Sequence, residues 1–278
     1  MDLGKINYWK HPSKTNCVFV DKRELSLISI DIWCKAGMIF EERNKDGTAH
    51  FLEHMLFKGN KLLNSGDFDL RIESLGGSSN ASTGYDDVHY YVEIPPNSFG
   101  EALILLKDLV FSPDFDNNEF NLEKKVIIEE ILQNHDHKDE RIFNYFLSRV
   151  WLESKYGKSI LGKEENIENL KIIDLKNFHT KQYLPKNSCI AIAGKLPNDY
   201  LEILNNCKIK NTERNFDNRE ESLNIYNSIR KGKEIIFIKD IEFSRILIAW
   251  LIPNNREQKY ILGFEILSSI LSEGRNSI

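Results

Sequence analysis

The sequence predicts an α+β fold in which an antiparallel-rich sheet is packed by helices. Segments with the alternating pattern of strands lie within 25–94 and at 188–193, and they flank a block of helical periodicity at 97–183. Strands that flank helices, rather than alternate with them, favour this class over a doubly wound parallel sheet. Apolar residues make up 41% of the 278 residues, which is enough to bury a core.

The first elements are a strand and a helix. Leu25–Lys35 alternates apolar and polar residues and predicts a half-buried strand. Thr48–Lys58 carries apolar residues three and four positions apart, which predicts a helix with Thr48 as its N-cap. Gly59 marks the end of that helix.

A second helix and two strands follow. Ser65–Leu75 predicts the helix, and a pair of glycines ends it. Ser78–Thr83 and Asp87–Ile94 predict two strands around a turn at Gly84. The second strand places four apolar side chains on one face: Val88, Tyr90, Val92 and Ile94.

The next hundred residues, roughly, are expected to be mainly helical. Four segments have helical periodicity: 97–111, 118–134, 139–152 and 167–183. A short apolar run, Ser188–Ala193, then predicts a buried strand.

Two domains are expected. Residues 1–206 form the first, the polar and Asn-rich residues 207–233 form a linker, and residues 234–278 begin a second. The second domain is predicted to start with two strands and a helix: Glu234–Lys239, Arg245–Ile252 and Glu257–Leu271. This order repeats that of residues 25–58 without its histidines, so the second domain is expected to be an inactive and incomplete duplicate.

Charge and hydropathy exclude several classes of partner. The net charge is −5, so the chain lacks the basic field that drives binding to nucleic acid or to anionic membranes. The sequence contains neither a signal-peptide pattern nor an apolar run of membrane-spanning length, and a cytoplasmic location is expected. The four cysteines form no paired motif, which favours free thiols.

The main chemical signal is His50-Phe51-Leu52-Glu53-His54. On a helix, residues four apart share a face, so both imidazoles can bind one metal ion. Glu53 lies beside that face and can accept a proton from a metal-bound water. The alternative is a helix with two surface histidines, but the apolar neighbours indicate a buried helix, where histidines need partners.

A third protein ligand is expected on the helix at 118–134. This helix offers Glu123, Glu129 and Glu130. Glu123 and Glu130 are two turns apart on one face, so one can bind the metal while the other orients a ligand. Spacing alone does not choose between Glu129 and Glu130, which lie about 100° apart around the helix.

Five segments in order resemble the pitrilysin, insulin-degrading enzyme and mitochondrial processing peptidase family of inverted-motif (H-x-x-E-H) zinc metallopeptidases. They are HFLEHMLFKG, LGGSSNASTGYDDVHYY, LEKKVIIEEI, YGKSILGKEENI and YLPKNSCIAIAG, within about residues 20–195. The resemblance implies one Zn²⁺ bound by His50, His54 and Glu130, because Glu130 stands at the family's distance from His54. It leaves Glu123 as the supporting carboxylate.

The resemblance also implies the reaction and the fold. It implies one half of a clamshell metalloendopeptidase that hydrolyses peptides or small unfolded proteins, with Glu53 as general base. Asn80 and Ala81 would lie on the edge strand that binds the extended peptide, although the residues alone favour an ordinary polar edge. The alternative function is a non-catalytic scaffold or binding subunit, which usually lacks this set of residues.

A partner is expected as well. In the family, a second half closes over the zinc site, and the second domain here is shorter than its counterpart. The chain is therefore expected to need a C-terminal half or a partner subunit for full activity.

Overall fold

The computed structural model describes residues 4–152, 154–209, 230–239, 243–252 and 258–272. The chain forms two compact units, residues 1–232 and 233–278.

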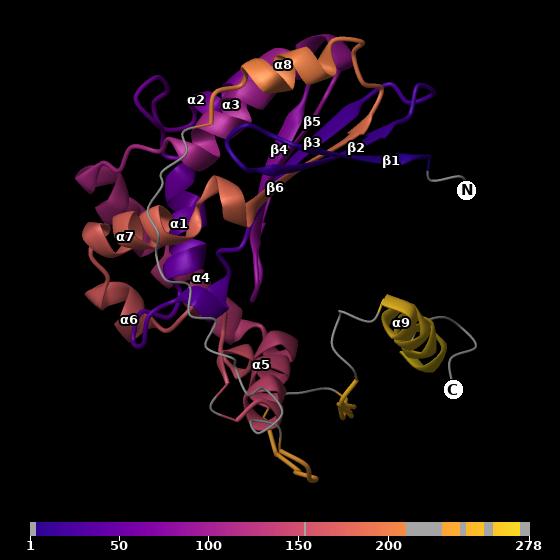
Figure 1. The fold of residues 1–278 in the computed structure, drawn as a ribbon. Helices are drawn as coiled ribbons and strands as arrows, with labels where there is room; N and C mark the ends of the chain where they lie inside the picture. The colour runs from indigo at the N-terminus through magenta and orange to yellow at the C-terminus, as the bar shows by residue number, and fades with distance from the viewer. Residues whose placement is uncertain (1–3, 153, 210–229, 240–242, 253–257, 273–278) are drawn as a thin grey trace. The chain divides into compact units, whose positions relative to one another are not determined.

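The larger unit is built on a six-stranded sheet with helices packed against one face (Figure 1). Neighbouring strands are antiparallel, except that β2 and β6 are parallel. In spatial order the strands are β1 (Ile6–Lys10), β2 (Asn16–Asp21), β6 (Ser188–Gly194), β3 (Ile28–Cys34), β5 (Val88–Ile94) and β4 (Ser78–Thr83). The predicted α+β class with an antiparallel-rich sheet is confirmed.

The described residues of this unit also contain eight α-helices. They are α1 (Thr48–Leu56), α2 (Asp67–Ser74), α3 (Phe99–Phe111), α4 (Asn117–Asp136), α5 (Lys138–Val150), α6 (Glu164–Asn169), α7 (Ile172–Gln182) and α8 (Tyr200–Asn206). α3 packs directly on β3 and β5, and α1 contacts α4, α7 and β4.

Strand alternation places the core between the sheet and the helices. Ile30 and Ile32 of β3, with Tyr90 and Val92 of β5, are 0% exposed. The residues between them point to the opposite face, where the described residues of this unit place no helix (Figure 1). One face of the sheet is therefore core and the other is open.

Some elements differ from the sequence prediction. β1, β2 and α8 were not predicted. In β1, exposed residues alternate with half-buried ones, so neither face is fully buried and the hydrophobic pattern in the sequence is weak. The helix expected at 167–183 is divided into α6 and α7. The Asp174 carboxylate accepts a hydrogen bond from the backbone N–H of Lys171 (2.9 Å), which starts a new helix.

The smaller unit contains α9 (Gln258–Ser272), close to the helix expected there. The strands predicted at Glu234–Lys239 and Arg245–Ile252 are wrong for this structure, because the described residues of those segments have no strand pairing. A strand needs a neighbour for its backbone groups, and the described part of this unit offers none. The expected linker lies mostly outside the described residues, so the domain boundaries stay a prediction.

No helix in the described part of the chain has both the length and the apolar character needed to cross a bilayer.

Two glycines share a left-handed backbone but differ in their surroundings. Gly162 has φ +80° and Gly66 has φ +82°. A Cβ atom at Gly162 would lie 2.3 Å from the backbone oxygen of Asp46, whereas one at Gly66 would meet no atom within 4 Å. Gly162 therefore allows the chain after α5 to touch the loop before α1.

This pair separates backbone strain from crowding. Gly66→Ala should lower the free energy of unfolding by about 1–2 kcal/mol, the cost of a left-handed conformation for an L-residue. Gly162→Ala should lower it by roughly 2–5 kcal/mol, because overpacking adds to the same strain. Urea unfolding followed by circular dichroism measures both values, and equal losses would show that the contact with Asp46 carries no energy.

Candidate metal centre

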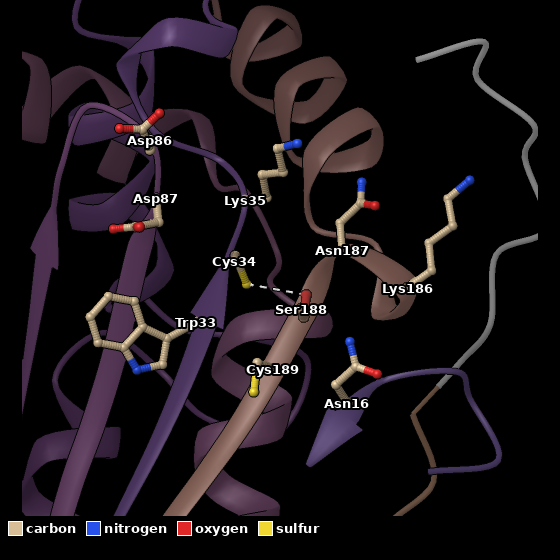
Figure 2. Close-up of a pocket in the computed structure, with 10 residues that line it drawn as sticks. All are labelled: Asn16, Trp33, Cys34, Lys35, Asp86, Asp87, Lys186, Asn187, Ser188 and Cys189. Atoms are coloured by element: carbon tan, nitrogen blue, oxygen red, sulfur yellow. Dashed lines mark hydrogen bonds between the residues drawn. The ribbon is translucent and has the colours of Figure 1, made fainter. Parts of the chain in front are cut away.

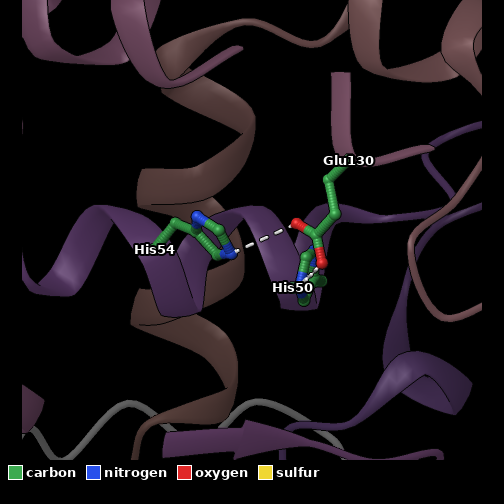
Figure 3. Close-up of side chains that lie close together, drawn as sticks. All are labelled: His50, His54 and Glu130. Atoms are coloured by element: carbon green, nitrogen blue, oxygen red, sulfur yellow. Dashed lines mark ion pairs between the residues drawn. The ribbon is translucent and has the colours of Figure 1, made fainter. Parts of the chain in front are cut away.

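Two helices bring two imidazoles and one carboxylate together (Figure 3). His50 and His54 stand one turn apart on α1, and Glu130 comes from α4. Glu130 Oε1 lies 3.8 Å from His50 Nε2, and Glu130 Oε2 lies 3.7 Å from His54 Nε2. One atom from each of the three residues lies within 4.8 Å of the other two.

A buried carboxylate fixes the start of α1. Glu41 accepts hydrogen bonds from the backbone N–H groups of Gly47 (3.0 Å) and Ala49 (2.8 Å). Thr48 is not the N-cap that the sequence predicted, because its hydroxyl donates to the Lys45 carbonyl instead. Burial raises the pKa of Glu41 to about 8, although both hydrogen bonds favour its charged form.

The segment after α5 holds the loop that contains Glu41. Lys155 Nζ donates to the carbonyl oxygens of Ile39 (2.7 Å) and Glu41. Lys158 Nζ forms an ion pair with the buried Asp46 (2.9 Å). Residues 155–158 therefore support the helix that carries the histidines.

His54 is oriented by a carboxylate from α4. Its Nδ1 lies 2.8 Å from Glu123 Oε1, and Glu123 Oε2 lies 2.6 Å from Lys58 Nζ. Burial alone would lower the pKa of His54, but the Glu123 hydrogen bond and three nearby carboxylates raise it overall. Burial alone would raise the pKa of Glu123, but the hydrogen bonds from His54 and Lys58 lower it overall. The contact leaves His54 Nε2 facing Glu130.

His50 is more enclosed than His54. Burial, followed by the nearby His54, lowers the pKa of His50 to about 3, so the ring is neutral near pH 7. Its Nδ1 is buried and has no hydrogen-bond partner among the described residues. A neutral imidazole offers the lone pair that a metal ligand needs.

These residues fit a zinc ion. Two histidines and one glutamate, with a fourth position open, form a known catalytic zinc set. Ligand atoms about 2.1 Å from a tetrahedral ion lie roughly 3.4 Å apart. The two histidine–glutamate separations of 3.7 and 3.8 Å are close to this value, and all three ligand atoms lie within 4.8 Å of one another.

Glu53 lies next to this group without belonging to it. Its Oε2 accepts a hydrogen bond from the Thr83 hydroxyl at the end of β4. Burial raises the pKa of Glu53, and the Thr83 bond offsets only part of that rise. A carboxylate with a raised pKa can accept and later release a proton near neutral pH.

Asn80 and Ala81 lie on β4, which is an edge strand of the sheet. The Ala81 N–H donates to Asn80 Oδ1 (2.9 Å) and therefore points away from β5. On the helix side of β4, the Ser79 hydroxyl donates to Asp69 of α2 (2.6 Å). The strand is thus attached to two helices, to α2 through Ser79 and to α1 through Thr83.

Spacing left Glu129 as an alternative to Glu130, and the structure separates the two. Glu129 is exposed, whereas Glu130 faces the histidines. Three contributors were missed in the sequence: Glu41, Lys58 and Thr83. Lys58 follows His54 by four residues, so helical spacing could have identified it. Glu41 contacts the start of α1 from the preceding loop, and Thr83 contacts Glu53 from the edge strand β4. No local sequence pattern indicates either contact.

A separate pocket of about 400 Å³ lies at the end of the sheet where β3 finishes and β6 begins (Figure 2). Its lining mixes carboxylates, amines, amides and thiols: Asn16, Trp33, Cys34, Lys35, Asp86, Asp87, Lys186, Asn187, Ser188 and Cys189. None of the candidate metal ligands lines it, so this pocket is distinct from the centre on α1.

Comparisons with known proteins bear on both parts of the chain. Residues 18–164 match the family described as Insulinase (Peptidase family M16), and residues 169–278 match the family described as Peptidase M16 inactive domain. An uncharacterized zinc protease of Rickettsia bellii is 28% identical over 252 residues, which cover 90% of this chain and 60% of that protein.

Two further relatives are similar over shorter shares of their length. Mitochondrial-processing peptidase subunit beta of Homo sapiens is 32% identical over 177 residues, covering 64% of this chain and 36% of that protein. The crystal structure of a protease from Helicobacter pylori matches with a TM-score of 0.73 and 27% identity, covering 76% of this chain and 52% of the other. The chain thus spans less than two thirds of the length of each relative.

Substitution of the α4 carboxylates tests the ligand set. Glu130→Gln should weaken zinc binding most, and Glu123→Gln should weaken it by about 10- to 100-fold, as expected for a residue that orients a ligand. Glu129→Gln is the matched control and should leave zinc affinity unchanged. Competition with a chelator measures all three, and a dominant loss in Glu129→Gln would show that the assignment is one residue off.

Proposed function

Because the chain belongs to the insulinase family of peptidases (peptidase family M16), we propose that it is the metal-bearing part of a zinc-dependent endopeptidase. Its substrates would be peptides or small unfolded proteins bound in extended form. The convergence of His50, His54 and Glu130 within 4.8 Å is the main support for this proposal. Glu53 lies beside them with its carboxylate outside the ligand set.

The proposed mechanism assigns one task to each side chain. Zinc held by His50, His54 and Glu130 would supply the positive charge that acidifies a water and polarises the scissile carbonyl. Glu53 would take the proton from that water and pass it to the amine nitrogen of the leaving product. Glu123 would hold His54 through Nδ1, which keeps Nε2 available as a ligand.

The substrate would add a strand to β4. A peptide carbonyl can accept the Ala81 N–H once the Asn80 side chain has moved away, and main-chain pairing of this kind demands no particular sequence. The position of β4 at the sheet edge supports this role, as does its bond to Glu53 through Thr83.

A second half of the same family would complete the site. The match of residues 169–278 to a Peptidase M16 inactive domain supports such a partner, supplied by a C-terminal half or by another subunit. Closure over the metal centre would exclude water and strengthen the electrostatic interactions within it. A purely structural subunit is less well supported, because every proposed ligand and the base are present.

Substitution of Glu53 tests the enzyme proposal. The chain, assayed together with its C-terminal half or partner subunit, should hold about one zinc, and Glu53→Gln should retain it while losing hydrolysis of an unstructured fluorogenic peptide by roughly 10²- to 10⁴-fold. Metal analysis and peptide cleavage, measured on the same samples, check both parts. Cleavage by Glu53→Gln at the parent rate would exclude Glu53 as the base, and parent protein without metal would exclude the enzyme.

A second set of variants tests whether Thr83 positions Glu53. Thr83→Val removes the hydroxyl and should lower kcat by roughly tenfold with little change in KM or zinc content, since a hydrogen bond to a charged group is lost. Thr83→Ser should restore kcat. Ser79→Ala loses a similar bond on the same strand, to Asp69, and should keep kcat near the parent value. An equal fall of kcat in Ser79→Ala would mean that Thr83 only attaches the strand.

A further inference from the structure

Lys58 contacts the carboxylate that orients His54. Glu123 divides its two oxygens between two neighbours, since Oε1 lies 2.8 Å from His54 Nδ1 and Oε2 lies 2.6 Å from Lys58 Nζ. The Glu123 side chain is 7% exposed, so water has little access to its oxygens, whereas the lysine side chain is 27% exposed. These contacts run from Lys58 to the candidate metal centre, where His54 Nε2 faces Glu130.

The backbone beside Lys58 is attached to the segment that leads into α4. The Gly59 carbonyl accepts a hydrogen bond from the Asp114 N–H (3.3 Å), and Asn60 forms an antiparallel bridge with Pro113. The Lys58 N–H donates to a carbonyl in the last turn of α1 (3.1 Å). Lys58 is thus held between the two helices that carry the candidate ligands, which limits the positions that its ammonium group can reach.

The proton on the His54 ring decides which nitrogen can bind a metal. Nε2 is available only while the proton of the neutral ring is on Nδ1, and an acceptor at Nδ1 favours that form and fixes the plane of the ring. Glu123 can act in this way only if its own oxygens stay in place. With Lys58 on Oε2, the carboxylate cannot rotate without breaking an ion pair, so Oε1 stays directed at His54.

Charge alone would give Lys58 the opposite effect on a metal ion. An ammonium group repels a divalent cation, so removal of its positive charge should by itself strengthen zinc binding. Removal of a group that holds Glu123 should instead weaken zinc binding, because Glu123 holds a ligand. The sign of the change in affinity therefore distinguishes the two effects.

We propose that Lys58 is a positioning residue of the metal centre, which acts through Glu123 to keep Nε2 of His54 directed at the ion. This inference rests on the proposed zinc site. Lys58 contacts neither ligand atoms nor substrate in this arrangement, so its whole effect passes through one carboxylate. Two consequences follow: its contribution to zinc affinity disappears when Glu123 is removed, and the His54 ring depends on it even without metal.

Zinc affinity, measured by competition with a chelator, tests the sign of the effect. Lys58→Met should weaken zinc binding by about 3- to 30-fold, less than the loss of a ligand. Lys58→Arg should restore most of the affinity, since a guanidinium group also donates to carboxylates. Lys61→Met is the matched control, an exposed lysine in the loop after α1, and should leave the affinity unchanged. Unchanged or tighter binding by Lys58→Met would overturn the proposal.

A double-mutant cycle tests the route of the effect. In a Glu123→Ala background, Lys58→Met should change zinc affinity by less than about twofold, because the carboxylate through which it acts is gone. A loss as large as in the parent background would show that Lys58 acts by another route. Circular dichroism of each variant checks that the fold is retained.

The metal-free protein provides a readout that does not depend on zinc. Nitrogen NMR of isotope-labelled histidine, at a pH where the ring is neutral, reports which ring nitrogen of His54 carries the proton, and a His54→Gln spectrum assigns the signal. The parent should hold the proton on Nδ1, and Lys58→Met should shift part of it to Nε2. The same distribution in both proteins would also overturn the proposal.

The outcomes separate this inference from the function on which it rests. Absence of zinc binding by the parent chain would contradict the proposed metal centre, and the role of Lys58 would fall with it. Zinc binding by the parent, together with an unweakened Lys58→Met variant, would remove only the role of Lys58 and leave the metal centre intact.

Discussion

The contact between His54 and Glu123 is the constraint on which the candidate centre depends. It joins helices whose residues are 69 positions apart, and it fixes how α4 crosses α1. Since Glu130 lies two turns beyond Glu123 on the same face, this crossing also brings Glu130 to the imidazoles. Glu123 is buried, and its charge is tolerated because His54 and Lys58 both contact it. A carboxylate that orients a ligand thus also sets the helix packing.

A second set of contacts connects the centre with the sheet. The base and the edge strand share the Thr83–Glu53 hydrogen bond, and the start of α1 depends on Glu41 and on the lysines after α5. The described fold therefore supports one short helix from three directions: from β4, from α4 and from the segment that follows α5. Such support keeps side chains in fixed rotamers, which a catalytic arrangement requires.

The sequence predicted those parts of the fold whose signals are local. α1 and β4 begin at the predicted residues, and β5 buries the predicted face, because alternation and helical spacing are properties of the segment itself. β1 gave no signal because neither of its faces is fully buried. The division between α6 and α7 depends on one side chain, Asp174, within a continuous helical pattern. In the site, Glu129 and Glu130 were equivalent by spacing, and only the packing of α4 on α1 distinguishes them geometrically.

The outer edge of β4, with which no strand of the described residues pairs, has a thermodynamic consequence for any segment that binds there. A segment can offer its backbone groups to Ala81 only if they are not already bonded within its own helix or sheet. The free energy needed to release them is subtracted from the affinity, and each 1.4 kcal/mol weakens it about tenfold. An edge of this kind therefore binds most tightly those polypeptides in which a stretch of chain unfolds at the lowest free energy, independently of their side chains.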